Sequence, residues 1–591
     1  MVVVQEMRKQ AEATRLAGEG TMSKRAYIAA YFAVAFISTT LIFVVEGLPD
    51  LTSCKPVIPP LRTDEIDCCF VDTSRPIKDF KFNLDLPLRV RRPAHKLDDG
   101  FIRKYERAVE LMKALPPEDP RSFSAQSKLH CSYCAGAYNE FNSSVMLSVH
   151  QGWFVLPFHR WYMYFHERIL ASLIGDDTFA IPYWAWDVQN DNPPANIIPP
   201  IFTNKNSNLY DELRSKIHQP PHRADLQFWD SIPRGIEKDN PSAILLRDND
   251  YAMWATMKGH VQTPRAFYGG PKSYDWAHTT PGPGEFELGP HTAIHYWTGD
   301  LDSGYYEDMG PAFSSARDPI FYAHHSNIDR LWLMWKSWGG LDLDDPAWLD
   351  TEFLFYDENA DMVRVTVRDS LNFENFRITY EQLEADWLSY TPKSIRDIDP
   401  KYVQSSSMLR RFLRQVVTWV KYDHIAMALG SFFQKENSEP NVFLGGTARA
   451  TARATATARV SRPEVTVRSM EVSSVYDEVL VISGVVEKPC DATFLINMFL
   501  ELPEADENTP RHCVEFLGAV VVVAEGLPDG TDRIISREFR RTVGIRETLR
   551  ILDITRQPSV TVTFVPAWDP RYDTEISVRV TDLKMERRRA R

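Results

Sequence analysis

Two groups of histidines combine a residue type and a spacing that suit metal chemistry. Each group supplies three neutral nitrogen donors and no acidic or thiolate ligand. Three imidazoles around one ion suit copper or zinc better than calcium, magnesium or an iron–sulfur cluster. The groups are, in chain order, His130, His150 and His159, then His291, His295 and His325. Two such triads in one chain indicate a pair of copper ions that share one site.

Helical spacing limits which histidines can share an ion. His291 and His295 stand four residues apart, so we expect them on one face of a helix. His324 and His325 compete for the third position of this group. Adjacent helical residues point about 100° apart, so we expect only one of the two to bind. Spacing alone does not choose between them.

Periodic apolar residues predict the helices that position these ligands. Apolar residues recur at spacings of three and four over residues 101–115, which predicts an amphipathic helix. Long helices are also expected over residues 158–174 and 319–338, and a fourth should carry His130. Four such helices predict a bundle whose metal ligands point inward. Residues 190–285 are rich in Pro, Asn, Asp and Gly, so we expect long surface loops there.

The composition changes sharply in the last third of the chain. Residues 445–463 consist mainly of Thr, Ala and Arg after two glycines, so they lack the apolar side chains of a core. We predict a flexible linker there that trypsin-like proteases would cut. Beyond it apolar residues alternate with polar ones, as at Val560 and Val562, which is typical of half-buried strands. This period of two predicts an all-β, sandwich-like domain over residues 464–585.

Length and charge narrow the possible partners. A chain of 591 residues is long for one domain, so we expect two or three. The formal net charge is −13. This acidity argues against a nucleic-acid partner, because phosphate binding needs a basic face.

The N-terminus has the features of a targeting segment. Residues 26–45 contain no charged residue, and their number is close to what a bilayer span requires. Residues 1–25 hold one Ser and three Glu, unlike a Ser-rich, acid-poor transit peptide. We therefore interpret residues 1–50 as a leader into the secretory pathway, which predicts a secreted, vacuolar or membrane-anchored lumenal protein. Membrane contact is expected only through this segment, if it is retained.

The residues around both triads resemble those of a known family. His130 begins the run HCSYC, His159 lies in LPFHRW, His291 begins HTAIH, and His325 lies in FYAHHSN. These runs resemble the CuA and CuB motifs of type-3 copper proteins. Within that class they resemble the plant polyphenol oxidases, which include catechol oxidases and tyrosinases. The resemblance extends over about residues 54–580.

The resemblance carries expectations for fold and activity. It implies a mainly α, tyrosinase-type copper domain built on a four-helix bundle, followed by the β domain. It favours His325 over His324 and implies two copper ions per chain, CuA and CuB. The implied reaction oxidises small o-diphenols to o-quinones while dioxygen is reduced to water, and weak hydroxylation of monophenols stays open. In this family the β domain covers the active site until it is removed, which implies a latent enzyme with an activating protease as partner.

The resemblance also implies bonds made by the cysteines. Seven cysteines fit an oxidising compartment. The implied bonds are the disulfides Cys54–Cys69 and Cys68–Cys131 and a thioether from Cys134 to His150. Cys490 and Cys513 remain, either as a third bridge or as two free buried thiols.

Further site residues follow from alignment with the family motifs. Glu287 matches a glutamate that holds a water near CuB and could help to deprotonate a phenol; a solvated loop carboxylate is the alternative. Thr292 follows the first CuB histidine, where relatives with Asn often hydroxylate monophenols well. The family's gate phenylalanine above CuB aligns with Ala312, so either the gate is missing or Phe313 has taken its role.

The expected domain map follows from these boundaries. It consists of the leader 1–50, the copper domain 51–340, a middle segment 341–444 that completes the copper domain, the linker 445–463 and the β domain 464–585. A dioxygen carrier of the hemocyanin type and a phenol hydroxylase (tyrosinase) as the main activity are the rival functions. A two-zinc hydrolase usually needs a bridging carboxylate, which neither motif supplies. Many seed-plant relatives go to the thylakoid lumen, which is the alternative location.

Overall fold

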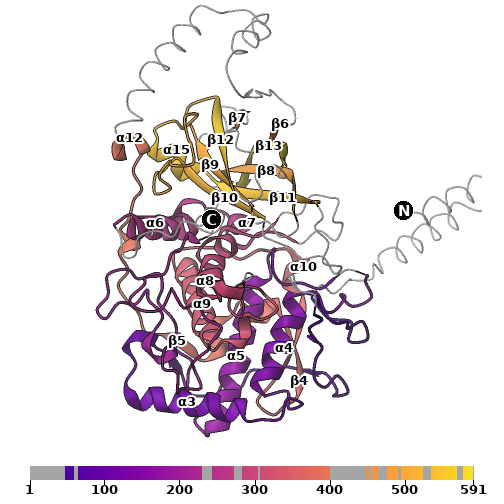
Figure 1. The fold of residues 1–591 in the computed structure, drawn as a ribbon. Coiled ribbons are helices and arrows are strands. Elements are labelled where there is room, and N and C mark those ends of the chain that lie inside the picture. The colour runs from indigo at the N-terminus through magenta and orange to yellow at the C-terminus, as the bar shows by residue number, and fades with distance from the viewer. Residues whose placement is uncertain are drawn as a thin grey trace, which may run out of the picture. The chain divides into compact units, whose positions relative to one another are not determined.

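The computed structural model describes most of the chain between residues 47 and 589 (Figure 1). The described ranges are 47–58, 64–144, 146–228, 243–271, 282–303, 306–399, 448–451, 456–462, 476–489, 494–522, 534–568 and 577–589. The apolar run on which the leader prediction rests lies outside them. Within these ranges, no helix combines the length and the apolar character needed to cross a membrane.

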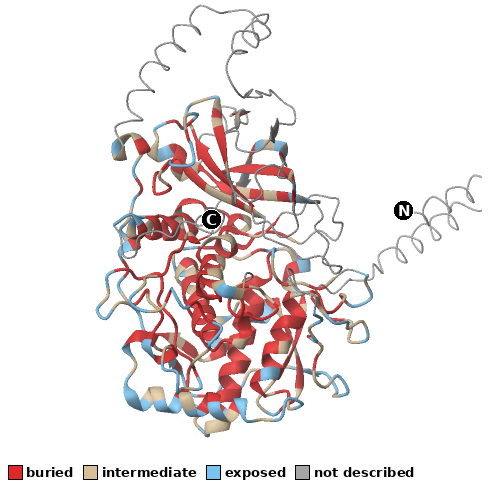
Figure 2. Cartoon of the chain, in the orientation of Figure 1, coloured by how far each residue is buried: buried red, intermediate tan, exposed pale blue. Residues whose placement is uncertain are grey.

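Helices form the part of the chain that contains the histidines. Their bounds are α3 (Asp99–Lys113), α4 (Phe123–Cys134), α5 (Val155–Ile174), α6 (Ala243–Trp254), α7 (Pro264–Tyr268), α8 (Thr292–Thr298), α9 (Ile320–Ser337), α10 (Pro346–Leu349), α11 (Val367–Ser370), α12 (Ile395–Ile398) and, later in the chain, α15 (Arg546–Ile551). The long helices expected from periodicity correspond to α3, α5 and α9. Most residues of α4, α5 and α9 are buried (Figure 2).

Local chemistry explains where two ligand-bearing helices begin and end. The hydroxyl of Ser122 accepts a hydrogen bond from the backbone N–H of Ala125 at 3.1 Å and so caps α4. Helix α5 ends at Gly175, whose φ of +64° favours glycine. Every residue of α5 from Val155 to Ala171 is buried. Packing on all sides therefore stabilises α5, as in the centre of a large core.

A buried ion pair joins α5 to α9. Arg160 follows His159 in the chain and donates to Asp329 Oδ1 at 2.6 Å. Asp329 lies four residues beyond His325, and both side chains of the pair are at most 4% exposed. Because removal of one partner would leave the other charge buried and unpaired, the pair resists separation of the two helices. It thereby fixes the relative position of His159 and His325.

Short sheets connect residues 78–91 to the segment after α9. Strand β1 (Lys78–Asp79) pairs in parallel with β4 (Met362–Thr366), which pairs with β3 (Glu352–Tyr356). Strand β2 (Arg89–Arg91) pairs in parallel with β5 (Ile378–Tyr380). Residues 78–91 and the middle segment thus complete the helical part of the fold.

The C-terminal part is built on β-strands. Its described strands are β6 (Ala448–Thr451), β7 (Ala456–Ser461), β8 (Tyr476–Pro489), β9 (Phe494–Leu500), β10 (Phe516–Val522), β11 (Ile534–Gly544), β12 (Ser559–Trp568) and β13 (Ser577–Arg589). They form two sheets, ordered β10-β9-β12-β7 and β11-β8-β13-β6 (Figure 1). Leu480, Ile496 and Val562 contribute to an apolar core of their own. The prediction of a C-terminal β domain is confirmed, but the domain is not all-β, because the short helix α15 lies between β11 and β12.

The flexible linker predicted over residues 445–463 is corrected by the structure. Strand β6 pairs with β13, and β7 pairs with β12, where Val460 lies opposite Val560. Thr and Val favour extended backbone, and each strand lies at the edge of its sheet and needs only one hydrogen-bonded neighbour. Large apolar side chains are therefore not required. Residues 445–447, 452–455 and 463 lie outside the described residues.

The expectation of surface loops over residues 190–285 is also corrected in part. This region contains α6, α7 and a π-helical turn, Ala255–Gly259. Tyr251, Met253 and Trp254 are at most 3% exposed. The average composition of the region hides a short apolar stretch, and that stretch forms a buried helix.

Candidate metal centre

Two helices and a loop assemble the first histidine group. His130 lies on α4, His159 on α5 and His150 between the two helices. The Nε2 atoms of His130 and His159 are 3.2 Å apart. Two nitrogens bound to one ion at about 2.0–2.1 Å, at a near-tetrahedral angle, stand about 3.3 Å apart. One ring nitrogen from each histidine and the sulfur of Cys134 all lie within 4.8 Å of one another.

The second group contains four histidines. His291 ends the π-helical turn Glu287–His291, His295 lies on α8, and His324 and His325 lie on α9. One ring nitrogen of each lies within 4.8 Å of those of the other three. The Nε2 atoms of His295 and His325 are 3.2 Å apart. The separation of about 100° keeps neither His324 nor His325 away from the group, because both imidazoles converge on it.

The two groups are neighbours. The rings of His159 and His325 are stacked, with centroids 3.9 Å apart and planes 8° apart. The rings of His150 and His291 are 6.0 Å apart and nearly parallel. These two ring contacts support a single site with two metal positions.

Burial keeps the fully buried histidines of the two groups neutral. Loss of solvent lowers the pKa of His295 to about 3 and lowers the pKa values of the other fully buried histidines of the groups. His159 Nδ1 donates to the carbonyl of Val155, and His295 Nδ1 to that of Met309, each at 2.7 Å. These bonds leave both Nε2 lone pairs available to a metal. The donor set therefore fits copper, with neutral imidazoles as ligands.

Glu287 connects the two groups. Its Oε1 accepts a hydrogen bond from the backbone N–H of Gln151 at 2.7 Å and lies 3.3 Å from His150 Nδ1. It therefore orients a histidine of the first group from a turn that carries a histidine of the second. The hydroxyl of Thr292 donates to the backbone carbonyl of Glu287 at 2.5 Å, which fixes the end of that turn.

Trp186 forms a hydrogen bond with His324 that the sequence pattern does not predict. Its indole Nε1 donates to His324 Nδ1 at 3.0 Å, and both residues are buried. The partners are 138 residues apart in the chain. The aromatic run around Trp184 and Trp186 was a signal of burial, but it did not indicate a partner.

Known families match three successive stretches of the chain. Residues 120–337 match the family described as "Common central domain of tyrosinase", and residues 342–393 match "Polyphenol oxidase middle domain". Residues 450–585 match "Chloroplastic Polyphenol Oxidase C-terminal domain". These matches follow the order of the histidine core, the middle segment and the β domain.

Named relatives match about two thirds or more of this chain. The chain is 35% identical over 546 residues to "Polyphenol oxidase, chloroplastic" from Malus domestica, which covers 91% of this chain and 84% of that protein. The chain belongs to the plant polyphenol oxidase family. It is also similar to aureusidin synthase from Antirrhinum majus, at 43% identity over 66% of this chain and 67% of that protein. (+)-Larreatricin hydroxylase, chloroplastic, from Larrea tridentata is 35% identical over 88% of this chain and 82% of that protein.

Solved structures of plant polyphenol oxidases have the same fold. Latent apple tyrosinase superposes with a TM-score of 0.70 at 34% identity, over 87% of this chain and 100% of that chain. Latent aurone synthase from its natural source gives 0.72 at 29% identity, over 92% and 99%. The chain therefore has a tyrosinase-type core and a C-terminal β domain. It is a dicopper enzyme that oxidises o-diphenols to o-quinones and reduces dioxygen to water.

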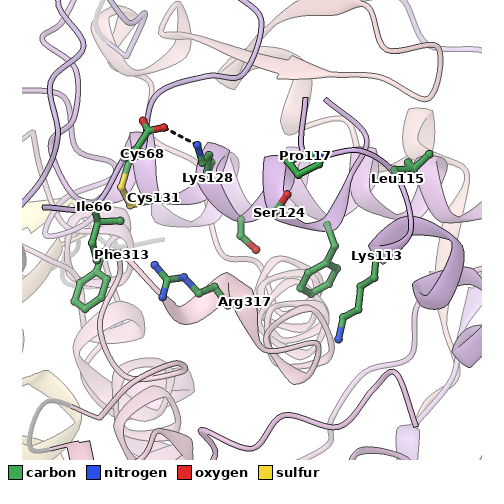
Figure 3. Close-up of a pocket in the computed structure, with 13 residues that line it drawn as sticks. Ile66, Cys68, Lys113, Leu115, Pro117, Ser124, Lys128, Cys131, Phe313 and Arg317 are labelled. Carbon is green, nitrogen blue, oxygen red and sulfur yellow. Dashed lines mark hydrogen bonds and ion pairs between the residues drawn. A yellow bond between two sulfur atoms is a disulfide. The ribbon is translucent and has the colours of Figure 1, made fainter. Parts of the chain in front are cut away.

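One of the two positions predicted for the gate of this polyphenol oxidase borders a cavity. Phe313 is buried and lines a cavity of about 570 Å³ together with Ser124 and Cys131 of α4 (Figure 3). The residues that line it include none of the histidines of the two groups. Ala312 is partly buried against the main core. The gate role of Ala312 or Phe313 stays a prediction.

The cysteines of the copper domain form two disulfides, and Cys134 lies close to the first histidine group. The structure contains the disulfides Cys54–Cys69 and Cys68–Cys131, the pairs that the family resemblance implies. Cys134 Sγ lies 3.3 Å from His130 Nε2 and within 4.8 Å of a ring nitrogen of His150. Cys513 is a buried thiol that donates to the carbonyl of Pro510, whereas Cys490 lies outside the described residues.

Proposed function

We propose that this enzyme oxidises catechols at a copper pair held by His130, His150 and His159 on one side and His291, His295 and His325 on the other. The observation that supports this assignment most strongly is the stacking of His159 on His325, 3.9 Å apart. Two copper ions held there supply the two-electron redox chemistry that couples diphenol oxidation to dioxygen reduction. The histidines provide neutral donors that suit both oxidation states of copper.

Glu287 is the proposed acceptor of the phenol proton. The backbone N–H of Gln151 donates a hydrogen bond to Glu287 Oε1. Glu287 Oε2 is buried and has no hydrogen-bond partner among the described residues. A fixed carboxylate beside the metal groups is suited to proton transfer. Thr292 holds the backbone of the same turn and so keeps the carboxylate in place. The thioether from Cys134 to His150 would further restrain the first group.

Hydroxylation of monophenols is the second candidate activity. The relative named (+)-larreatricin hydroxylase favours it, because it shares most of this chain's length. Thr292 stands where relatives with Asn often hydroxylate monophenols well, so we propose this activity as the weaker one. If the enzyme reacts faster with monophenols than with catechols, phenol hydroxylation is its main activity.

The β domain is proposed to make the enzyme latent by covering the copper domain. Leu495 of β9 belongs to the core cluster of the copper domain. His512 Nδ1 lies 2.8 Å from Asp248 on α6, and Glu515 accepts the backbone N–H of Ile395 at 2.9 Å. These contacts remain after a cut elsewhere in the chain, so activation would require both a protease and release of the domain.

Finer features of architecture and location belong to the same proposal. Helices α3, α4, α5 and α9 would form the four-helix bundle, and the β domain would form a sandwich.

Residues 1–50 would direct the chain into the secretory pathway and provide its membrane contact. The relatives named chloroplastic favour the alternative, the thylakoid lumen. The location of a fluorescent fusion of the full chain in plant cells distinguishes the two.

Oxygen uptake by the copper-loaded chain tests the proposed activity. We expect sustained uptake with catechol and slower uptake with tyramine, both rising once the β domain is removed. Reversible binding of dioxygen without turnover of catechol would instead indicate a carrier and contradict the proposal.

A further inference from the structure

We infer that the indole N–H of Trp186 decides which of the adjacent histidines, His324 or His325, binds copper. Trp186 donates to His324 Nδ1 at 3.0 Å, and both side chains are at most 1% exposed. This inference rests on the proposed copper pair and assigns Trp186 as a positioning residue for it.

Position does not separate the two candidates. His324 and His325 both lie on α9, both are buried, and a ring nitrogen of each reaches the second group. The ring of His324 lies 4.7 Å from that of His295, and the ring of His325 lies 5.2 Å from it. A choice between them must therefore come from the state of the nitrogens rather than from distance.

The hydrogen bond fixes the state of His324. An indole N–H only donates, so His324 Nδ1 must present a lone pair to Trp186. A neutral imidazole carries one proton, which then resides on Nε2. A doubly protonated ring has no acceptor nitrogen, so the bond from Trp186 itself requires the neutral form of His324. One nitrogen is occupied by Trp186 and the other carries the proton, so His324 has no lone pair left for a metal.

His325 is under no such restriction. Its Nδ1 has no hydrogen-bond partner among the described residues, so the proton can reside there. Its Nε2 then presents a lone pair toward His295 Nε2, 3.2 Å away. The separation of these two atoms is close to the value of about 3.3 Å for two imidazoles on one ion.

Trp184 provides a matched control. It is a second fully buried tryptophan two residues earlier, and its backbone N–H bonds to the carbonyl of Ala323, next to His324. Its indole Nε1 has no hydrogen-bond partner among the described residues. Trp184→Phe therefore makes the same change in volume without altering a histidine tautomer.

The test measures copper per chain in the full-length protein after loading and desalting. His325→Ala should reduce two coppers to about one. Adding Trp186→Phe frees His324 Nδ1, so the proton can move there and Nε2 can bind; copper should return to about two. Adding Trp184→Phe instead should leave about one, and adding His324→Ala to the Trp186→Phe double variant should remove the regained copper.

Each other result contradicts a stated part of the account. Two coppers in His325→Ala alone, or no recovery with Trp186→Phe, would overturn the role of Trp186. A wild-type chain that does not hold two coppers would contradict the proposed function and this inference with it. If the double variant does not fold, the ultraviolet resonance Raman difference between wild type and Trp186→Phe decides: loss of a hydrogen-bonded indole signal supports the inference, and loss of a free indole signal overturns it.

Discussion

Arg541 on strand β11 forms a bidentate ion pair with Glu285, which lies two residues before Glu287. Its Nη2 lies 2.8 Å from both carboxylate oxygens, and its Nε lies 3.1 Å from Oε1. Both side chains are 5% exposed. The β domain is thus joined by a buried charge pair to the chain segment that leads into the second histidine group.

Arg541→Ala should therefore weaken the docking of the β domain. Removal of one partner of a buried pair costs about 3–5 kcal/mol, because the other charge stays buried and unpaired. We expect the full-length variant to oxidise catechol several-fold faster than the full-length wild type, without proteolysis.

Arg550→Ala is the control for that change. Arg550 pairs with Glu547 on the same domain, but its side chain is 64% exposed. Exposed pairs contribute little, so this variant should stay as latent as wild type. Equal latency of the Arg541 and Arg550 variants would contradict the role of the buried pair.

Truncation tests whether the whole β domain acts as the cover. A copper-loaded chain that ends at Gly446 lacks every described strand from β6 onward. It should be active on catechol from the start and gain nothing from trypsin. If its rate does not exceed that of the full chain, the β domain has a role other than latency.

Glu287→Gln tests the proposed proton acceptor. The amide oxygen of Gln can still accept the Gln151 N–H, so the loop with His150 should keep its position. Loss of the carboxylate charge should lower kcat for catechol by roughly 10²–10⁴-fold. Copper content should stay at two per chain. Unchanged kcat, with copper retained, would show that Glu287 only holds the loop.

The sequence predicts those features of the fold and of the site that depend on neighbouring residues. It does not predict those that depend on contacts between distant parts of the chain. The gathering of the histidines into two groups could be predicted, because spacing on helices constrains His291 and His295 and because the runs around His130 and His159 resemble family motifs. The hydrogen bond from Trp186 to His324 could not be predicted from the sequence, because only the fold brings these two distant residues together. Strands β6 and β7 are not predictable from local sequence for a similar reason: their hydrogen bonds come from β13 and β12, more than 90 residues later in the chain.

Asp308 should make the stability of the copper domain depend on pH. Burial raises the pKa of Asp308 to about 8, with the charge of Asp211 as the next cause. A carboxyl whose pKa is higher in the folded state contributes stability below its unfolded pKa and loses that contribution as pH rises through the folded pKa. Stability should therefore fall between about pH 4 and about pH 8.

Asp308→Asn removes this dependence. The melting temperature of the variant should exceed that of wild type at pH 8 and approach it at pH 5. Thermal unfolding followed by fluorescence at the two pH values measures the difference. A wild type that is equally stable at both values, or a variant that loses as much between them, would contradict the raised pKa.

Copper content and catechol oxidation of two histidine variants, measured together, test the central assignment most directly. His159→Ala removes a proposed ligand that is stacked on His325. His166→Ala changes another fully buried histidine on the same helix, which packs on Tyr322 and belongs to neither metal group. We expect His159→Ala to bind fewer than two coppers and to lose catechol oxidation, whereas folded His166→Ala should keep two coppers and its activity. Two coppers and full activity in His159→Ala would contradict the assignment.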